Sequence, residues 1–432
     1  MNVTDRFLQY VSFGTNSDEK SESCPSTPGQ LALGAALAKE LKAIGLTDVE
    51  QDADGYVYGY LPGEGEALGL LAHMDTSPAV PGDHIKPRIV TYTGGVLELG
   101  ASALSPVDYP FLADYIGQQL IVTDGTTLLG ADDKAGVAEI VTLCEMLIAH
   151  PEIKHRPIAV CFTPDEEIGR GTDRFRMERF PAKEAYTVDG GELGEIEYEN
   201  FNAASATVTV HGLNIHPGSA KNKMKNAALL LAEFIGLLPA AETPAHTEGY
   251  EGFFHLCEIK GDETSAEAAY IIRDHDREKF EARKALMTQT VEYMNRKYGP
   301  GTFTLQMTDS YYNMKEKLTG HMHLIRNAEA AMQKAGVTPQ IVAIRGGTDG
   351  ARLSYEGLPA VSISTPSTNS SPSPPWKKWW RCCATSSPCN PAKKLPLPIS
   401  GRGLFHVSLF FITLNHAPER FCGVKATGST AT

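Results

Sequence analysis

Four short segments of the sequence carry side chains that could bind metal ions and transfer a proton. They are His73 with Asp75, Asp132 with Asp133, the acidic run 165–167, and Asp189. Adjacent carboxylates raise one another's pKa unless a cation lies between them. A hydrolytic site with two metal ions needs a bridging carboxylate, His or carboxylate ligands for each ion, and a base that takes a proton from the attacking water. The four segments together contain all of these groups.

Each segment also has an ordinary structural interpretation. The run 165–167 fits a solvated acidic turn, and Asp189 precedes two glycines, as in many turns. Asp132 and Asp133 fit helix caps that the helix dipole favours. A lone histidine such as His73 is most often a surface residue. The occurrence of all four segments at comparable places in one fold favours a metal site over these separate interpretations.

Hydrophobic patterns place these segments at the ends of strands. Unbroken apolar runs at 158–163, 68–72 and 185–188 are typical of strands that are buried on both faces, as in a parallel sheet. The spacing of apolar residues over 135–148 predicts a helix that begins just after one of the acidic segments. Alternating strands and helices indicate an α/β fold with an open sheet, in which ligand sites lie beyond the carboxyl ends of the strands.

A second domain interrupts this alternation. From 206 to 316 the predicted order is strand, helix, strand, strand, helix, strand, which is that of a ferredoxin-like α+β domain. We therefore predict a catalytic domain in two parts, 1–205 and 317–365, with an inserted lid domain at 206–316. Residues 366–432 form a tail of different composition.

Composition limits the partners of the protein. The 432 residues carry a formal net charge of -13, which argues against binding to nucleic acid or to an anionic membrane surface. The sequence shows neither a secretory signal nor an apolar run long enough to span a membrane. The eight cysteines show no paired spacing in the first 360 residues, as expected of a reduced protein. We expect a cytoplasmic protein with a small-molecule substrate, and a homo-oligomer stays open.

The same segments resemble the metal-site motifs of the M20 metallopeptidases. The resemblance runs in order from about residue 5 to Pro359 and is strongest to the tripeptide aminopeptidases of that family. The runs that carry it read AHMDT at 72–76, LGADDKAG at 129–136, FTPDEEIG at 162–169, YTVDGG at 186–191, DSYYNM at 309–314 and IRGGTDGA at 344–351. Motifs of this length in this order are specific, so the resemblance implies a zinc-peptidase fold with two zinc ions.

The resemblance implies a role for individual positions. The implied zinc ligands are His73 and Asp189 for one ion, Glu167 for the second, and Asp132 as the bridge between them. Asp75 would orient His73, and Glu166 would be the general base. The chemistry agrees, because a free carboxylate next to a metal ligand is well placed to accept a proton.

The resemblance also implies how a peptide is held. Substrate contacts are expected from His216, Asn226, Arg273 and Arg345. His216 would stabilise the developing oxyanion after lid closure, and a guanidinium would suit the C-terminal carboxylate of the peptide. Without the resemblance, a surface histidine and structural ion pairs would explain these residues equally well. Recognition of both peptide ends would favour tripeptides, from which the N-terminal residue is released.

The resemblance ends after Ile363. Residues 366–432 hold all three tryptophans, four of the eight cysteines, eight basic residues and one acid, and we expect them to be an aberrant, disordered tail. The family continues with a histidine that completes the second metal site, and the tail shows no motif that would replace it. In another reading frame, codons for 368–370 permit His-Glu-Phe, which predicts a frame change near residues 361–367. Two alternatives therefore stay open: an inactive remnant with one zinc, and a related amidohydrolase that acts on N-acyl amino acids.

Overall fold

The structure of the protein is a computed structural model, and it describes residues 1–366 and 371–372. The tail predicted at 366–432 lies outside the described residues, apart from Pro366 and the pair 371–372, which belong to strands. The frame change and the missing histidine concern this part of the chain and stay predictions. Among the described residues, no helix combines the length and the apolar character that a membrane span requires.

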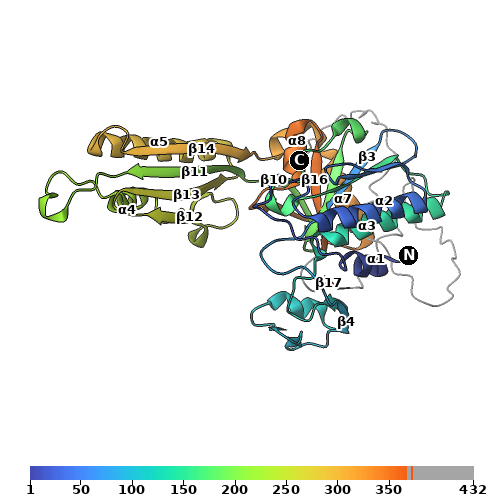
Figure 1. Cartoon of the computed structure of the whole chain (residues 1–432). Helices are drawn as coiled ribbons and strands as arrows, with labels where there is room; N and C mark the ends of the chain where they lie inside the picture. The colour runs from blue at the N-terminus through green and yellow to red at the C-terminus, as the bar shows by residue number, and fades with distance from the viewer. Residues whose placement is uncertain (367–370, 373–432) are drawn as a thin grey trace, which may run out of the picture.

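The larger part of the protein is built on an eight-stranded mixed sheet (Figure 1). Its strands lie in the order β1 (Thr47–Gln51), β2 (Val57–Leu61), β8 (Ile158–Thr163), β3 (Leu68–His73), β9 (Ala185–Gly191), β16 (Ala360–Pro366), β10 (Glu195–Asn200) and β15 (Gln340–Ile344). The central strands β8, β3, β9 and β16 are parallel, so their carboxyl ends meet at one edge. The prediction of a parallel strand at 158–163 is right on one side, whereas on the other side β8 pairs antiparallel with β2.

Side chains of the central strands alternate between two hydrophobic cores. Leu70 and Val160 pack in the core that holds the helices α1 (Val3–Tyr10), α2 (Pro28–Ile44), α3 (Ala131–Ala149) and α7 (His323–Ala335). Leu71 and Cys161 pack in a second core together with Leu353 of α8 (Asp349–Glu356). Because both faces of β3 and β8 are covered, every residue of these strands is buried, which explains their unbroken apolar runs.

A four-stranded antiparallel sheet forms the lid domain, which extends away from the first sheet (Figure 1). Its strands lie in the order β12 (Phe253–Gly261), β13 (Ser265–Asp274), β11 (Asn202–His211) and β14 (Phe303–Tyr311). The helices α4 (Ala227–Leu237) and α5 (Arg277–Tyr298) share one hydrophobic core with this sheet. The predicted ferredoxin-like arrangement is confirmed, although β11 begins at Asn202 and not at the predicted Ala206, because residues 202–205 also pair with β13.

Smaller elements complete the described residues. Below the main sheet in Figure 1 lies a small sheet of β17 (Ser371–Pro372), β7 (Gln119–Val122) and β4 (Arg88–Thr91), accompanied by the pair β5 (Leu97–Glu98) and β6 (Ala103–Leu104) and by the 3₁₀ helix η1 (Pro110–Tyr115). The other short helices are η2 (Glu166–Ile168), η3 (Met177–Arg179), η4 (Pro217–Ser219), η5 (Pro244–His246), α6 (Lys315–Leu318) and η6 (Thr319–His321). Of these, η2 carries the proposed base and η6 leads into α7.

Candidate metal centre

Three neighbouring strands bring the predicted ligands to one edge of the eight-stranded sheet. The strand β3 lies between β8 and β9, and all three are parallel. His73 is the last residue of β3 and pairs with Thr163, the last residue of β8. Asp189 lies in the second half of β9, and Asp132 lies in the first turn of α3. The chain therefore gathers these side chains because parallel strands end at the same edge.

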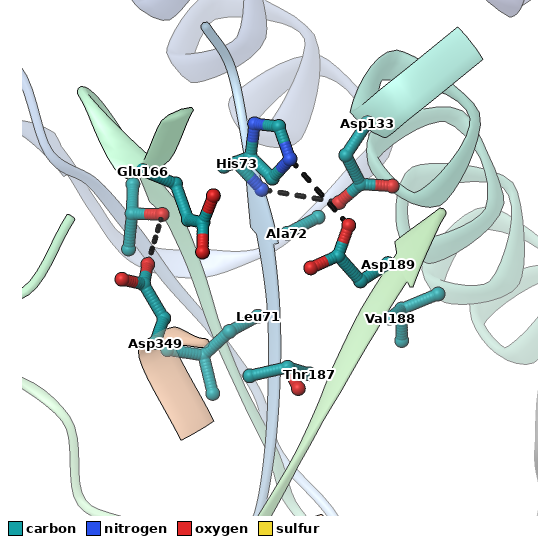
Figure 2. Close-up of a pocket in the computed structure, with 10 residues that line it drawn as sticks. Leu71, Ala72, His73, Asp133, Glu166, Thr187, Val188, Asp189 and Asp349 are labelled. Atoms are coloured by element: carbon teal, nitrogen blue, oxygen red, sulfur yellow. Dashed lines mark hydrogen bonds and ion pairs between the residues drawn. The ribbon is translucent and has the colours of Figure 1, made fainter. Parts of the chain in front are cut away.

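His73 lies at the centre of a cluster of carboxylates (Figure 2). Its Nε2 atom lies 2.9 Å from Oδ1 of Asp132 and 3.5 Å from Oδ1 of Asp189. Its Nδ1 atom lies 3.3 Å from Oδ1 of Asp75, and only 4% of the side chain is exposed. Burial by itself favours the neutral ring, but hydrogen bonds to Asp132, Asp189 and Asp75 raise the pKa of His73 well above its usual value.

Two overlapping groups of side chains each have ligand atoms that lie within 4.8 Å of one another. One group is His73, Asp132 and Glu167, and the other is His73, Asp133 and Asp189. An imidazole nitrogen with several carboxylate oxygens is a donor set that suits zinc and other divalent cations. The structure thus brings the four predicted ligands together, and their assignment to particular ions stays a prediction.

For Asp133 the sequence leaves open a helix cap or a place in the metal site, and the structure shows it in one of these groups. Its side chain is fully buried. One oxygen accepts a hydrogen bond from the backbone N–H of His73, and the other accepts one from the N–H of Gly136, each over 3.1 Å. Because both oxygens are used by backbone amides, Asp133 fixes the start of α3 against the end of β3. It therefore positions the ligands beside it.

Asp75 contacts both His73 and the loop that carries Glu166 and Glu167. Its Oδ1 atom accepts the backbone N–H of Glu166 over 2.9 Å, and its Oδ2 atom accepts that of Glu167 over 3.1 Å. The same carboxylate faces Nδ1 of His73, and it is completely buried. One side chain thus orients the imidazole and the loop that carries the proposed base and ligand. This geometry agrees with the orienting role that the resemblance implies.

We expect the substitution Asp75→Asn to lower zinc affinity about 10- to 100-fold, as loss of an orienting partner usually does. The amide nitrogen cannot accept one of the hydrogen bonds that the carboxylate now accepts, so the loop or the ring must shift. Competition with a chromophoric chelator measures the affinity. Asp124→Asn is a matched control, because Asp124 pairs with Lys86 away from this edge of the sheet. Equal zinc affinity in the Asp75→Asn variant and in the unmodified chain would contradict the orienting role.

Glu166 faces a pocket that Asp349 also lines (Figure 2). Burial, and then the charge of Asp349, raise the pKa of Glu166 well above its usual value. Asp349 accepts a hydrogen bond from Oγ1 of Thr163 over 3.0 Å, and burial raises its own pKa to about 7. Carboxylates with raised pKa values are suited to proton transfer near neutral pH. Sequence reasoning missed Asp349, although the run 344–351 that contains it had been identified as a motif.

The pKa of Glu167 leads to a prediction about pH. Burial raises this pKa from 4.5 to about 7, with His73 acting in the opposite direction and Asp132 adding to the increase. In the metal-free chain, the folded state therefore binds a proton between pH 4.5 and about 7 that the unfolded state releases. The free energy of unfolding should consequently fall as pH rises through this window, and Glu167→Gln should remove part of that fall.

Melting temperatures of the zinc-free chain and the Glu167→Gln variant, measured at several pH values across this window, test this expectation. Saturating zinc should reverse the trend in the unmodified chain, because metal ligands must be deprotonated. If the melting temperatures of the two proteins change with pH to the same extent, Glu167 is not the group responsible.

Two predicted substrate residues lie at the junction between the lid and the main sheet. Nη1 of Arg273 donates a hydrogen bond to the carbonyl oxygen of Arg345 over 3.0 Å. The guanidinium of Arg345 donates to the carbonyl oxygens of Gly249 and Glu251, and it lies over the ring of Phe201 at 5.1 Å from the centroid. Arg345 would have to exchange these partners before it bound a peptide carboxylate. Its role in substrate binding stays a prediction.

The other two predicted substrate residues lie in the lid. His216 and Asn226 line one open cavity together with Glu263. Strand β11 begins at the main sheet and runs for ten residues, so at about 3.3 Å per residue the loop after it lies roughly 30 Å away (Figure 1). Within one chain, the structure therefore does not bring His216 to the cluster around His73.

Tyr311 is a further polar group near the proposed base that sequence reasoning missed. Its hydroxyl is buried at the end of β14 and has no hydrogen-bond partner in the part of the chain that the structure describes. Burial raises the pKa of Tyr311, while the charges of Arg273 and Glu166 act on it in opposite directions. Tyr311 is thus close enough to Arg273 at the domain junction and to Glu166 for both charges to act on it. The run 309–314 is a motif in the sequence, but its strand pattern does not show which of its side chains lies near Glu166.

Comparisons with known proteins agree with this geometry. Residues 198–302 match the family model described as a peptidase dimerisation domain. The chain is 53% identical over 371 residues to peptidase T of Halothermothrix orenii, an alignment that covers 84% of this chain and 91% of that protein. It is 52% identical to peptidase T of Clostridium novyi, also over 371 residues, with the same coverage of both chains.

Solved structures show the same fold. Aminopeptidase PepT from Bacillus cereus aligns with a TM-score of 0.66 at 24% identity, covering 84% of this chain and 89% of the other. A dinuclear metal-binding peptidase of the M20 family from Bacillus subtilis aligns with a TM-score of 0.55 at 13% identity, covering 84% and 88%. The fold class expected from the resemblance is thus confirmed, and so is the family. The chain belongs to the peptidase T family of the M20 peptidases.

Proposed function

We propose that this chain is an aminopeptidase that uses two zinc ions to release the N-terminal residue of tripeptides. The observation that carries the proposal is the arrangement around Asp75, which binds the ring of His73 and the backbone amides of Glu166 and Glu167 at once. A proposed ligand and a proposed base are thereby held next to the cluster of Asp132 and Asp189. Relatives that share about half of its residues are called peptidase T, which supports the same activity.

The residues of this chain would divide the chemistry between them. Bound at the cluster, zinc ions would act as Lewis acids toward the attacking water and the scissile carbonyl. Glu166 would accept the proton from the water at its carboxylate and then deliver it to the departing amine. Its raised pKa makes this carboxylate a better base than an exposed glutamate. Asp75 would keep the imidazole of His73 oriented throughout.

Purified chain with added zinc, assayed on di-, tri- and tetrapeptides with free or acylated N-termini, tests the proposal. Cleavage of tripeptides at the first peptide bond supports it. Hydrolysis restricted to N-acyl amino acids would instead show an amidohydrolase. A full zinc complement without turnover of any of these substrates would also refute the proposal.

One observation favours a second candidate, an inactive protein that binds a single zinc. Within residues 1–366 and 371–372, His73 is the one imidazole in the two carboxylate groups at this edge. A zinc ion that is held by carboxylates alone is bound less well than one with an imidazole ligand. About one zinc per chain and no turnover of peptides would support this candidate, whereas two zinc ions with tripeptide cleavage would exclude it.

The position of His216 supports a site that two copies of the chain share. Its loop lies roughly 30 Å from the start of β11, and the cluster around His73 lies back in the main sheet. The lid sequence matches a family model described as a peptidase dimerisation domain. We therefore propose a homodimer in which His216 of one copy completes the site of the other and stabilises the oxyanion there.

Mixing two inactive variants tests this arrangement. Glu166→Gln and His216→Ala should each abolish most turnover when they are measured alone. If subunits exchange freely, half of the dimers are mixed, and one of their two sites retains both residues, so about a quarter of full activity should return. Gel filtration under the same conditions shows whether dimers form. No recovery from mixtures with demonstrated exchange would contradict a site shared between copies.

A further inference from the structure

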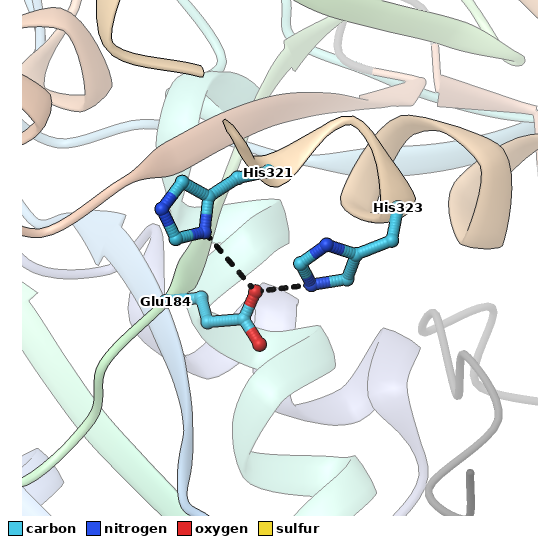
Figure 3. A group of neighbouring side chains, drawn as sticks. All are labelled: Glu184, His321 and His323. Atoms are coloured by element: carbon cyan, nitrogen blue, oxygen red, sulfur yellow. Dashed lines mark hydrogen bonds and ion pairs between the residues drawn. The ribbon is translucent and has the colours of Figure 1, made fainter. Parts of the chain in front are cut away.

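A second group of metal-ligating side chains lies away from the metal centre. It consists of Glu184, His321 and His323, whose ligand atoms all lie within 4.8 Å of one another (Figure 3). Oε2 of Glu184 lies 2.5 Å from Nε2 of His323 and 3.8 Å from Nδ1 of His321. Both imidazole rings therefore turn toward the same carboxylate oxygen.

This group lies at the opposite edge of the sheet from the metal centre. Glu184 directly precedes β9, whereas Asp189 lies five residues further along the same strand, a separation of about 16 Å. His321 ends η6, and His323 is the first residue of α7. The group is consequently independent of the proposed aminopeptidase site.

The backbone around the group is held in place by other contacts. The N–H of Gly69 in β3 donates to the carbonyl oxygen of Glu184 over 2.9 Å. The hydroxyl of Tyr186 donates to the carbonyl oxygen of Leu324 over 2.8 Å, which ties β9 to the first turn of α7. The elements that carry the three side chains are thus fixed relative to one another before any ligand binds, as an effective metal site requires.

The contacts of the side chains leave room for a cation. Nδ1 of His321 is buried and makes no hydrogen bond within the described residues, because the carboxylate oxygen at 3.8 Å is too distant. The other oxygen of Glu184 faces Nη2 of Arg156 at 3.5 Å, so that Oε2 stays directed at the imidazoles. The side chains of His321 and His323 are 37% and 43% exposed, so solvent reaches part of each ring.

We propose that Glu184, His321 and His323 bind a zinc ion that fastens the start of α7 to the amino end of β9. Zinc takes two imidazole nitrogens and one carboxylate oxygen at about 2.0–2.2 Å and fills its remaining position with water. Neighbouring ligands of a tetrahedral ion lie somewhat over 3 Å apart, so His323 must move outward by roughly 1 Å while His321 moves little. Magnesium and calcium prefer oxygen ligands and should not bind here.

Histidine modification in the full-length chain tests the proposal site by site. Diethyl pyrocarbonate acylates neutral, accessible imidazoles, and peptide mass spectrometry reports each histidine separately. Zinc at ten times its dissociation constant should slow modification of His321 and His323 about tenfold, whereas magnesium should not. His150 is the matched control, because within the described residues its one carboxylate partner is Glu152, at 3.0 Å. Its modification should not depend on zinc.

Variants separate metal binding from a simple hydrogen bond. Glu184→Gln should abolish the zinc protection of both histidines, and His323→Gln should abolish that of His321. His73→Ala, which alters the metal centre at the other edge, should leave the protection unchanged. The proposal would be overturned if zinc did not change the rate at which His321 and His323 are modified. It would also be overturned if zinc still protected these histidines in the Glu184→Gln variant. Melting temperatures of each variant without zinc show whether the fold is intact.

Discussion

We expect the substitution Glu166→Gln to lower kcat for tripeptides about 10²- to 10⁴-fold, the usual contribution of a positioned general base. The amide has nearly the same shape as the carboxylate but cannot accept the proton of the attacking water. Zinc content should be unchanged, since Glu166 is not among the proposed ligands and the substitution keeps the backbone amide that donates to Asp75. Steady-state kinetics together with zinc analysis of the same preparation measure both quantities.

Retained zinc is what distinguishes loss of a base from loss of a ligand. Glu178→Gln is a suitable control, because Glu178 lies in η3, away from the pocket of Glu166, and should keep full activity. A Glu166→Gln variant whose kcat stays within about tenfold of the unmodified chain would exclude Glu166 as the base. A variant that loses zinc as well as activity would place Glu166 among the ligands.

The second large effect is expected at His73. The substitution His73→Ala should lower zinc affinity by more than about 100-fold, because loss of a mere orienting partner already costs 10- to 100-fold. The imidazole lies between Asp132 and Asp189, so its removal also leaves these carboxylates facing one another. Turnover of tripeptides should fall below detection at zinc concentrations that saturate the unmodified chain. Chelator competition and a tripeptide assay over a range of zinc concentrations measure the change.

Two controls accompany this experiment. His150→Ala removes an exposed histidine that pairs with Glu152, and it should change neither zinc affinity nor turnover at the metal centre. His73→Gln keeps most of the buried volume, so it separates loss of the ligand from a cavity in the core. Normal zinc affinity in both His73 variants would show that the cluster does not hold its metal through this side chain.

Local patterns in the sequence predict much of the fold. The runs at 68–72 and 158–163 are apolar without interruption because each strand contacts two hydrophobic cores. The six elements of the lid appear in ferredoxin-like order, and each is long enough to show its own periodicity. The antiparallel pairing of β2 with β8 could not be predicted, because the two strands lie about 100 residues apart in the sequence. A buried strand also has the same apolar pattern whether its neighbour is parallel or antiparallel.

For the candidate site, too, the sequence identified some residues and missed others. Residue types and motif spacing identified His73, Asp132, Glu167 and Asp189, with family resemblance assigning their roles. Asp349, which lines the pocket of Glu166, and Tyr311, whose pKa responds to the charge of Glu166, were both missed, although both lie within motifs. Asp349 meets Thr163 across 186 residues of chain, and no local pattern reports a contact over that separation.

The sequence by itself therefore determined which chemical groups are present, which strands end in them, and to which family the chain is similar. The tertiary structure alone decided that Asp75 joins His73 to the loop of Glu166 and that Arg345 donates hydrogen bonds to backbone carbonyls of the lid. It also decided that His216 lies beyond the far end of β11, away from the cluster around His73. It also decided that Glu184 meets His321 and His323. Hydrogen bonds and metal coordination act over about 2–3.5 Å, and distance along the chain does not constrain which atoms approach so closely.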